Sequence, residues 1–525
     1  MIRLSRRIGA ASAAFSLLFA APSLASAASG EWTSSPRLFE VRTLAGQPEQ
    51  GNADGSLKTA TFYHPYSTVA LPDGKLLVAD SANHLLRVVT ADKVTTYSGL
   101  YLGENESSQP LGAYRDDVLA KAAFDRPSGL SVDPQGNVYV ADSANHAIRK
   151  ISPDGKVSTL AGNGLLGSSD GTGGQAAFYN PSDVAVDSQG NVYVADTLNH
   201  TIRKIATDGK VTTVTAPSTR IIEYVAGAVE EAGDYQDGPL ASAKFNEPSG
   251  LVIDAQDNLY VSDRGNQRIR YINFTSGQVS TVAGGGGYAD SNAYFVSGGY
   301  VDGPATQARF NAPEGLSLTD DGALVIADSL NHAIRLLKNG KVSTLAGVPG
   351  EPGQSGGVPS AAQFNHPTDV TVLKDGRLVI ADEYGNKLRV LQPYAKPASL
   401  PSQQGASVLY NGSLVPSDVP AQLKGNAVLL PLRAVGQALG FKVGYDKTTG
   451  KALLTRGDTV YAISADDRSV TKTVAGKSTR LELNAMTTVI DGRLFIPVRF
   501  FADESGLDIQ WDSTARAVVI RSKTF

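Results

Sequence analysis

The stretch PSGLSVDPQGNVYVADSANHAIRKISPDGKVSTLAG, residues 127–162, contains four short segments in which apolar and polar residues alternate. The segments GLSVD, NVYVAD, AIRKIS and KVSTLAG show the period of two that is typical of β-strands. PQGN and PDGK lie between them, and in such turns Asp or Pro sets the bend while Gly supplies a positive φ. The stretch therefore predicts one sheet of four antiparallel strands.

This unit recurs along the chain. The Asp that closes its AD or SD dipeptide stands at positions 80, 142, 196, 263, 328 and 382, and a proline precedes each at 65, 127, 181, 248, 313 and 367. A sheet of four short strands cannot bury its faces alone. Six copies therefore predict six sheets packed around one axis, which is a six-bladed β-propeller.

The two ends of the repeat region predict how the ring closes. The last unit, PTDVTVLKDGRLVIADEYGNKLRVLQPY, holds three strand segments and no fourth, while LFEVRTLAG at residues 38–46 resembles the missing one. Because an open array exposes an unpaired edge, we expect the N-terminal segment to complete the last blade.

The unit pattern, PxGLxVDxxGNVYVADxxNHxIRKI, resembles the NHL repeat. Its longer bacterial form is similar to the joining segments DGPLASAKFNEP (237–248) and DGPATQARFNAP (302–313). The resemblance covers residues 37–394 and implies a six-bladed propeller. It implies little about the ligand, since relatives serve as interaction platforms and some related propellers are enzymes.

Asp142, Asn145, His146 and Arg149 lie close together and invite a catalytic interpretation. Four of the six histidines in the chain occupy this same repeat position, and we align Gln267 and Lys387 with it in the fourth and sixth units. A catalytic base is not needed four times and then replaced. We therefore interpret the cluster as a turn in which Asp, Asn and His bond backbone groups and Arg lies over the neighbouring strand.

The first residues predict export. Residues 1–27 hold three arginines, a short apolar run and Ala25-Ser26-Ala27, which is typical of a signal peptide rather than of a membrane span. No later segment reaches membrane-spanning length. The chain has no cysteine, which excludes disulfides, Cys-ligated zinc and a Cys nucleophile.

A Pro, Ser and Gln-rich linker at residues 395–405 precedes a second domain, residues 406–525. LLPLRAVGQALGFKVGYDKTTGKALL (429–454) and FIPVRFFADESGLDIQWDSTARAVVI (495–520) repeat each other, and each predicts a strand, a helix of about ten residues ending at Gly440 or Gly506, and a hairpin. We expect a smaller α+β domain with an internal two-fold repeat.

This second domain resembles the copper amine oxidase N-terminal-like stalk domain, which is common in exported proteins of Gram-positive bacteria. It contains neither histidine nor cysteine, so it offers almost nothing to ligate copper. The stalk is expected to position or attach the propeller, and we interpret the arginines shared by the two halves, Arg433 and Arg499, as structural.

Charge is unevenly distributed. Residues 405–525 carry 15 Lys and Arg against 11 Asp and Glu, so the preceding part of the mature chain is acidic. An acidic propeller argues against a nucleic-acid partner, which requires a basic face. A basic stalk favours an anionic cell wall.

The residues before the repeat prolines are the candidate ligand site at the channel rim. They differ between units while their surroundings repeat: His64, Arg126, Asn180, Glu247, Ala312 and His366. In one interpretation His64 and His366, from blades that become neighbours on closure, bind a divalent metal in a lyase or lactonase. In the other, which we prefer, the position is simply variable and no cofactor is bound.

The sequence thus predicts an exported, non-enzymatic propeller that presents a binding rim to an extracellular protein or a cell-wall glycan. The alternative is a metal-dependent propeller lyase or hydrolase acting at the channel mouth. No feature of the sequence specifies an oligomeric state.

Overall fold

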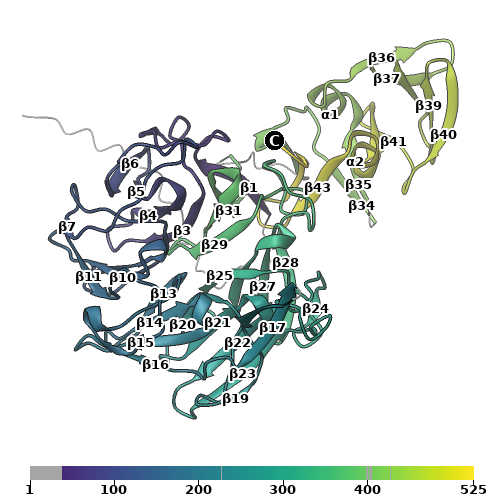
Figure 1. The fold of residues 1–525 in the computed structure, drawn as a ribbon. Coiled ribbons are helices and arrows are strands. Elements are labelled where there is room, and N and C mark those ends of the chain that lie inside the picture. Colours follow the sequence, from purple (N-terminus) through teal and green to yellow (C-terminus); the bar gives the residue numbers. More distant parts are fainter. Residues whose placement is uncertain (1–37, 226, 398–399, 401–404, 426) are drawn as a thin grey trace, which may run out of the picture.

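The computed structural model describes residues 38–525 except 226, 398–399, 401–404 and 426. The predicted signal peptide, residues 1–27, lies outside the described residues, and the predicted linker 395–405 is described only in part. Antiparallel sheets form a ring, and a smaller domain projects from one side of it (Figure 1). The predicted mainly β fold class is confirmed.

Six sheets of the described chain make up the ring, and we call them blades 1 to 6 in chain order. Blade 1 contains β2 (Gly55–Ser56), β3 (Pro65–Ala70), β4 (Leu76–Asp80), β5 (Leu85–Val89) and β6 (Lys93–Ser98). Blade 2 contains β7 (Asp117–Val118), β8 (Pro127–Val132), β9 (Val138–Asp142), β10 (Ala147–Ile151) and β11 (Lys156–Ala161). Blade 3 contains β12 (Gly171–Thr172), β13 (Asp183–Val186), β14 (Val192–Asp196), β15 (Thr201–Ile205) and β16 (Lys210–Thr213).

Blade 4 contains β19 (Gly238–Pro239), β20 (Pro248–Ile253), β21 (Leu259–Asp263), β22 (Arg268–Asn273) and β23 (Gln278–Gly284). Blade 5 contains β24 (Gly303–Pro304), β25 (Pro313–Leu318), β26 (Leu324–Asp328), β27 (Ala333–Lys338) and β28 (Lys341–Ala346). A separate hairpin of β17 (Arg220–Val225) and β18 (Ala228–Ala232) lies between blades 3 and 4 in the chain.

Blade 6 joins the two ends of the repeat region. It contains β29 (Pro367–Val372), β30 (Leu378–Asp382), β31 (Lys387–Pro393) and the N-terminal strand β1 (Phe39–Ala45). β1 runs antiparallel to β31, as the purple and green ribbons in Figure 1 show. Each innermost strand contacts the innermost strand of the next blade, and β29 contacts β3. The ring is therefore continuous through blade 6.

The joining segments supply a fifth, two-residue strand at the outer edge of blades 1 to 5. In blade 3, Gly171 and Thr172 pair with Val211 and Lys210. The sequence predicted four strands per blade, because two residues are too few for alternation to reveal a strand.

The hydrophobic core of the ring lies between adjacent blades. One cluster, for example, combines Tyr139 and Ala141 of blade 2 with Val192 and Val194 of blade 3. Each blade also contributes one fully buried phenylalanine, at position 62, 124, 178, 245, 310 or 364. Burial of such a side chain contributes about 2–3 kcal/mol, so packing between blades holds the ring together.

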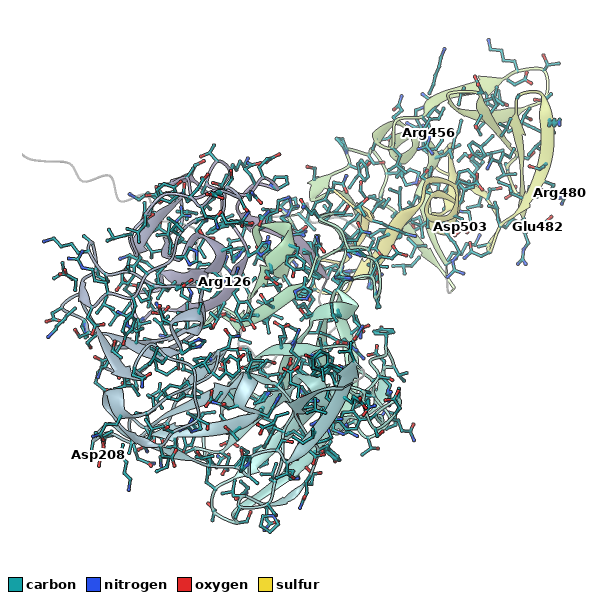
Figure 2. The ribbon with its side chains drawn as sticks, viewed as in Figure 1. Arg126, Asp208, Arg456, Arg480, Glu482 and Asp503 are labelled. Carbon is teal, nitrogen blue, oxygen red and sulfur yellow. The ribbon has the colours of Figure 1, made fainter. Side chains whose placement is uncertain are left out.

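The second domain has its own core and three sheets. Its elements are β32 (Ser407–Tyr410), β33 (Ser413–Leu414), β34 (Gln422–Lys424), β35 (Ala427–Pro431), α1 (Leu432–Ala438), β36 (Lys442–Asp446), β37 (Lys451–Arg456), β38 (Thr459–Ile463), β39 (Ser469–Val474), β40 (Lys477–Glu482), β41 (Thr488–Ile490), β42 (Arg493–Pro497), α2 (Val498–Ser505), β43 (Leu507–Asp512) and β44 (Ala517–Ser522). Arg480 and Glu482 on β40 lie far from the ring (Figure 2).

Both helices of this domain are shorter than the predicted ten residues, at seven and eight. Pro431 and Pro497 end strands and stand outside the helices as N-caps. Gly506 ends α2 with a φ of 63°, as predicted. No helix in the described part of the chain is long and apolar enough to cross a membrane.

The C-terminus docks this domain against blade 6. Thr524 pairs with Gly357, which pairs in turn with Val41 on β1. The hydroxyl of Tyr394 donates to Asp512 at 3.0 Å across the junction. The stalk is therefore attached through the same blade that joins the ends of the ring.

Candidate functional site at the channel mouth

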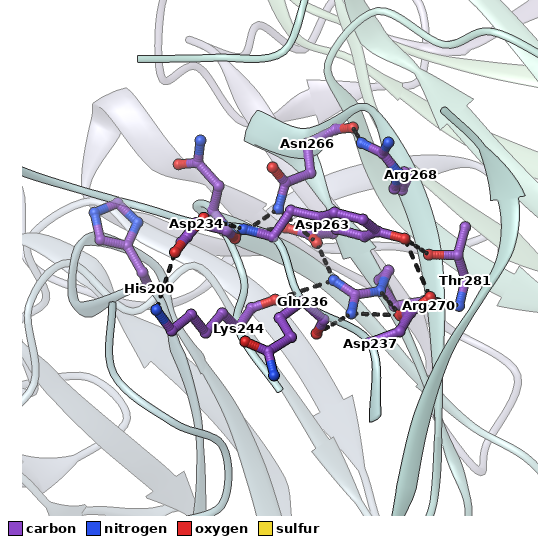
Figure 3. A network of polar contacts seen from close by, with 12 residues as sticks. His200, Asp234, Gln236, Asp237, Lys244, Asp263, Asn266, Arg268, Arg270 and Thr281 are labelled. Carbon is purple, nitrogen blue, oxygen red and sulfur yellow. Dashed lines mark hydrogen bonds and ion pairs between the residues drawn. The ribbon is translucent and has the colours of Figure 1, made fainter. Parts of the chain in front are cut away.

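The repeated Asp and Arg form a buried ion pair in every blade. In blade 2 the fully buried Arg149 donates from Nη1 to Asp142 at 2.6 Å and from Nη2 to Asp116, in the joining segment, at 2.6 Å. Figure 3 shows the equivalent network in blade 4, where Arg270 contacts Asp263 and Asp237. The arginine is thus fully buried within its own blade, where it pairs with the Asp that ends the adjacent strand β9.

The repeated histidine joins each blade to the next. Its Nδ1 accepts a hydrogen bond from the backbone N–H of the residue before the following repeat proline, as between His146 and Asn180 at 3.1 Å. The other five bonds link His84 to Arg126, His200 to Glu247, Gln267 to Ala312, His332 to His366 and Asn386 to His64. We call this bond the inter-blade clasp.

The assignment of Lys387 to this repeat position was wrong. Asn386 occupies it, with the left-handed φ of 52° that the histidines share, and Lys387 begins β31. In this unit Gly385 replaces the asparagine that usually precedes the histidine position, which hides the correspondence in the sequence. His, Gln and Asn are interchangeable here because each presents one acceptor to the next blade.

The six residues before the repeat prolines share one backbone conformation, with φ between 47° and 62°. They precede the innermost strands, which enclose a channel cavity of about 250 Å³. The clasp occupies only their backbone N–H, so their side chains remain available at one end of this channel. We call that end the mouth.

His64 and His366 meet at one carboxylate at the mouth. The Nδ1 of His366 lies 2.7 Å from Glu383, and the Nδ1 of His64 lies 3.5 Å from it. The ring of Tyr384 stacks on His366 at 4.6 Å. Burial lowers the pKa of His64. Burial also opposes protonation of His366, but the hydrogen bond to Glu383 and the charge of Glu314 outweigh it, so the pKa of His366 is raised. The two imidazoles therefore differ in pKa, that of His64 being shifted downward and that of His366 upward.

A second group of charges lies beside these histidines. Arg264 donates to Glu247 at 2.7 Å, and its Nε lies 3.2 Å from Glu314. Glu314 is only 4% exposed, and its Oε2 has no hydrogen-bond partner among the described residues. Burial raises the pKa of Glu314 and of Glu247, while the Arg264 charge opposes the rise. We call His64, Glu247, Arg264, Glu314, His366 and Glu383 the mouth cluster.

Three residues of the mouth cluster stand at repeat positions where other blades have serine or threonine. In blades 2 and 3 the residue after the proline is a serine whose hydroxyl donates to the next blade, as Ser128 does to the Ser182 carbonyl at 2.8 Å. The residue after the repeat Asp does the same, as Thr197 does to the Pro248 carbonyl at 2.9 Å. At these two positions blade 4 has Arg264, blade 5 has Glu314, blade 6 has Glu383 and blade 1 has Tyr66. Four consecutive blades thus each carry an ionisable side chain at one of these two positions. In blades 4, 5 and 6 the other position keeps its hydroxyl contact to the next blade, through Ser249, Ser329 and Thr368.

The remaining candidates of the rim differ in exposure. Arg126 is exposed, and its charge helps to lower the pKa of His64. Asn180 is half-buried, whereas Ala312 is 4% exposed and presents no polar group. The structure therefore brings three of the predicted residues, His64, Glu247 and His366, into the mouth cluster, and their role in binding a ligand stays a prediction.

The sequence analysis missed Arg264, Glu314 and Glu383. The sequence does distinguish these three residues, because each stands at a repeat position where other units have serine or threonine. The residue before the proline does not reveal them, because the replacements stand at the position after the proline or after the repeat Asp.

The two histidines do not complete a metal site. Among the residues that the structure describes, no group of three or more His, Asp and Glu side chains is arranged to hold a metal ion. Three protein ligands are usual for catalytic zinc, so we derive no step through a metal.

Comparison with known families agrees with this architecture. The NHL repeat family matches residues 124–151, 178–205, 245–270 and 364–391, and the copper amine oxidase N-terminal domain family matches residues 409–520. The chain contains NHL repeats and a copper amine oxidase N-terminal domain. The matched residues carry four of the six Asp–Arg pairs and include Glu247, Arg264, His366 and Glu383 of the mouth cluster.

Curated relatives share the NHL repeats over part of their length. NHL repeat-containing protein 2 of Homo sapiens is 27% identical over 430 residues, which cover 76% of this chain and 57% of that protein. SUPPRESSOR OF QUENCHING 1 of Arabidopsis thaliana is 30% identical over 289 residues, which cover 53% of this chain and 26% of that protein. The chain thus spans little more than half the length of the human relative and about a quarter of the length of the Arabidopsis relative.

Solved structures resemble the chain only weakly. A structural genomics protein of unknown function from Bacteroides thetaiotaomicron is 20% identical with a TM-score of 0.48, covering 68% of this chain and 76% of that one. An auxiliary nutrient binding protein from Bacteroides ovatus is 17% identical with a TM-score of 0.46, covering 68% and 77%. Neither likeness carries a functional conclusion.

Proposed function

We propose that this chain is an exported, non-enzymatic binding protein whose mouth cluster holds a cell-envelope glycan. The observation that carries the proposal is the replacement of inter-blade hydroxyls by Arg264, Glu314 and Glu383 on neighbouring blades. Burying a charged side chain lowers the stability of the folded protein. Such destabilising residues are expected at functional sites, where the charge serves binding or chemistry.

The chemistry of the mouth cluster suits sugar hydroxyls. The unbonded Oε2 of Glu314 offers an acceptor, or a donor when protonated. His366 and Arg264 offer donors, and Tyr384, which is 47% exposed, offers a ring face. The stalk, docked at blade 6, would hold the propeller in position.

The test uses the residue type that other blades carry. We expect the double variant Glu314→Ser/Glu383→Ser to fold with an unchanged or higher melting temperature, because the serines can form the hydroxyl contacts. We expect it to lose binding of soluble disaccharide muropeptides, measured by calorimetry, by about tenfold or more. Arg126 and Asn180 variants would show how far the site extends.

Three results would contradict this proposal. Equal muropeptide binding by the parent protein and the double variant would remove the mouth cluster from the function. Muropeptide cleavage, detected by mass spectrometry, would replace binding with the lyase or hydrolase alternative. Absence of glycan binding together with capture of a purified extracellular protein, lost in the double variant, would make the partner a protein.

A further inference from the structure

The second domain contains a groove of its own, far from the mouth cluster. This groove has a volume of about 690 Å³, within the range of small-molecule sites. It lies between α1, the strands β36 to β38, and the β41–β42 turn, whose residues line it. Three different parts of the domain therefore enclose one concave surface.

The groove combines an apolar floor with two exposed groups. Ile463 and Leu494 contribute to the floor. Tyr445 at the edge is 62% exposed, so most of its ring is uncovered. Arg433 is also exposed, and no hydrogen bond or ion pair to its guanidinium occurs among the residues the structure describes. Our interpretation of Arg433 as a structural residue is thus without a supporting contact.

The local charge favours an anion. The other arginine of the groove, Arg493, is already paired with Asp418, its Nε lying 3.0 Å from the carboxylate. Arg433 therefore remains as an uncompensated positive charge. The whole domain is also basic, with 15 Lys and Arg against 11 Asp and Glu in residues 405–525.

The two halves of the internal repeat differ in their contacts at one pair of equivalent residues. In the second half, the segment ending in Trp511 and Asp512 meets the propeller, and Asp512 accepts hydrogen bonds from Tyr394 and Lys396. In the first half, the equivalent Asp446 caps its own turn, accepting hydrogen bonds from Thr448 and Thr449. Tyr445, the counterpart of Trp511, is left facing the groove.

We propose that this groove binds an acidic sugar unit of a polysaccharide. The sugar ring packs on Tyr445, and its carboxylate or phosphate pairs with Arg433. An exposed tyrosine offers a flat, amphipathic face, and a free guanidinium offers the paired donors that both anions accept. The site lies in a different domain from the mouth cluster, so the two proposals stand or fall separately.

The test titrates the full chain with three oligosaccharides: an oligogalacturonide, a phosphorylated dextran and its neutral parent. We expect one or both acidic probes to bind, and the neutral dextran to bind at least about tenfold more weakly. The stronger acidic probe identifies carboxylate or phosphate as the preferred group. Binding should weaken as salt rises, because the pair is close to solvent.

Matched variants locate the site. Arg433→Gln and Tyr445→Ala should each weaken binding of the acidic probe by about tenfold, without changing the melting temperature. Arg499→Gln, at the equivalent position of the second half and outside the groove, should change it by less than about twofold. Equal losses in Arg433→Gln and Arg499→Gln would indicate nonspecific attraction and overturn the proposal. Failure of both acidic probes to bind, or equal binding of the neutral dextran, would also overturn it.

Discussion

Replacing His200 by glutamine is expected to remove one defined pH dependence from the stability of the propeller. His200 Nδ1 accepts the backbone N–H of Glu247 at 3.1 Å, and this clasp requires a neutral imidazole. Blade 4 makes the same clasp with a residue that does not titrate, since Gln267 accepts from Ala312 at 2.6 Å. Glutamine at position 200 should therefore preserve the bond and lose the titration.

The magnitude follows from the pKa. Burial, followed by the charge of Arg220, lowers the pKa of His200 from 6.5 to about 4. Above both values the imidazole is neutral in the folded and unfolded chains, and its contribution is complete. As the pH falls below 6.5 the unfolded chain takes up a proton that the folded chain does not accept until about pH 4. This linkage removes about 2 kcal/mol by about pH 5 and about 3 kcal/mol by about pH 4.

The assay is urea unfolding of the parent protein and His200→Gln at matched pH values between about 8 and 4.5. The difference between the two isolates His200, because the repeated buried Asp residues titrate alike in both proteins. We expect near-equal stability at about pH 8, and the variant to be more stable by about 2 kcal/mol at about pH 5. A difference that does not vary with pH would refute the clasp argument. His200→Leu is the control: it should be less stable than His200→Gln by about 1–2 kcal/mol at every pH, because neither side chain titrates and the leucine leaves the Glu247 N–H unbonded.

Three further perturbations test the ring and its junction. Arg149→Met should lower the free energy of unfolding by about 3–5 kcal/mol, because Asp142 is left as a buried unpaired charge; a loss below about 1 kcal/mol would contradict this. Deleting residues 38–45 should expose the edge of β31 and cause concentration-dependent association in light scattering, whereas a monomer of unchanged melting temperature would not fit. Asp512→Ala should speed proteolysis near Tyr394 while leaving the propeller transition in place, and equal cleavage rates would exclude a role for this contact.

Part of the mouth cluster was predictable because a residue that departs from the repeat pattern stands out when the units are aligned. The residue before each proline varies while its neighbours do not, and this variation alone identified His64 and His366. Arg264, Glu314 and Glu383 were not predicted as site residues, because a charged residue in a turn or strand is unremarkable within a single unit. Only comparison at two further repeat positions, where other blades have hydroxyls, separates them from the scaffold.

The local pattern of strands and turns follows from the sequence alone. Alternation of polar and apolar residues, turn chemistry and a recurring Pro and Asp predict sheets, their order and a second domain, because strand formation depends on near neighbours. The tertiary structure decided which of these residues meet. His64 and His366 are 302 positions apart in the chain, yet both face Glu383 because blade 6 lies beside blade 1. The structure also decided that each repeated histidine serves the next blade, since an acceptor within a turn has no partner until neighbouring sheets pack.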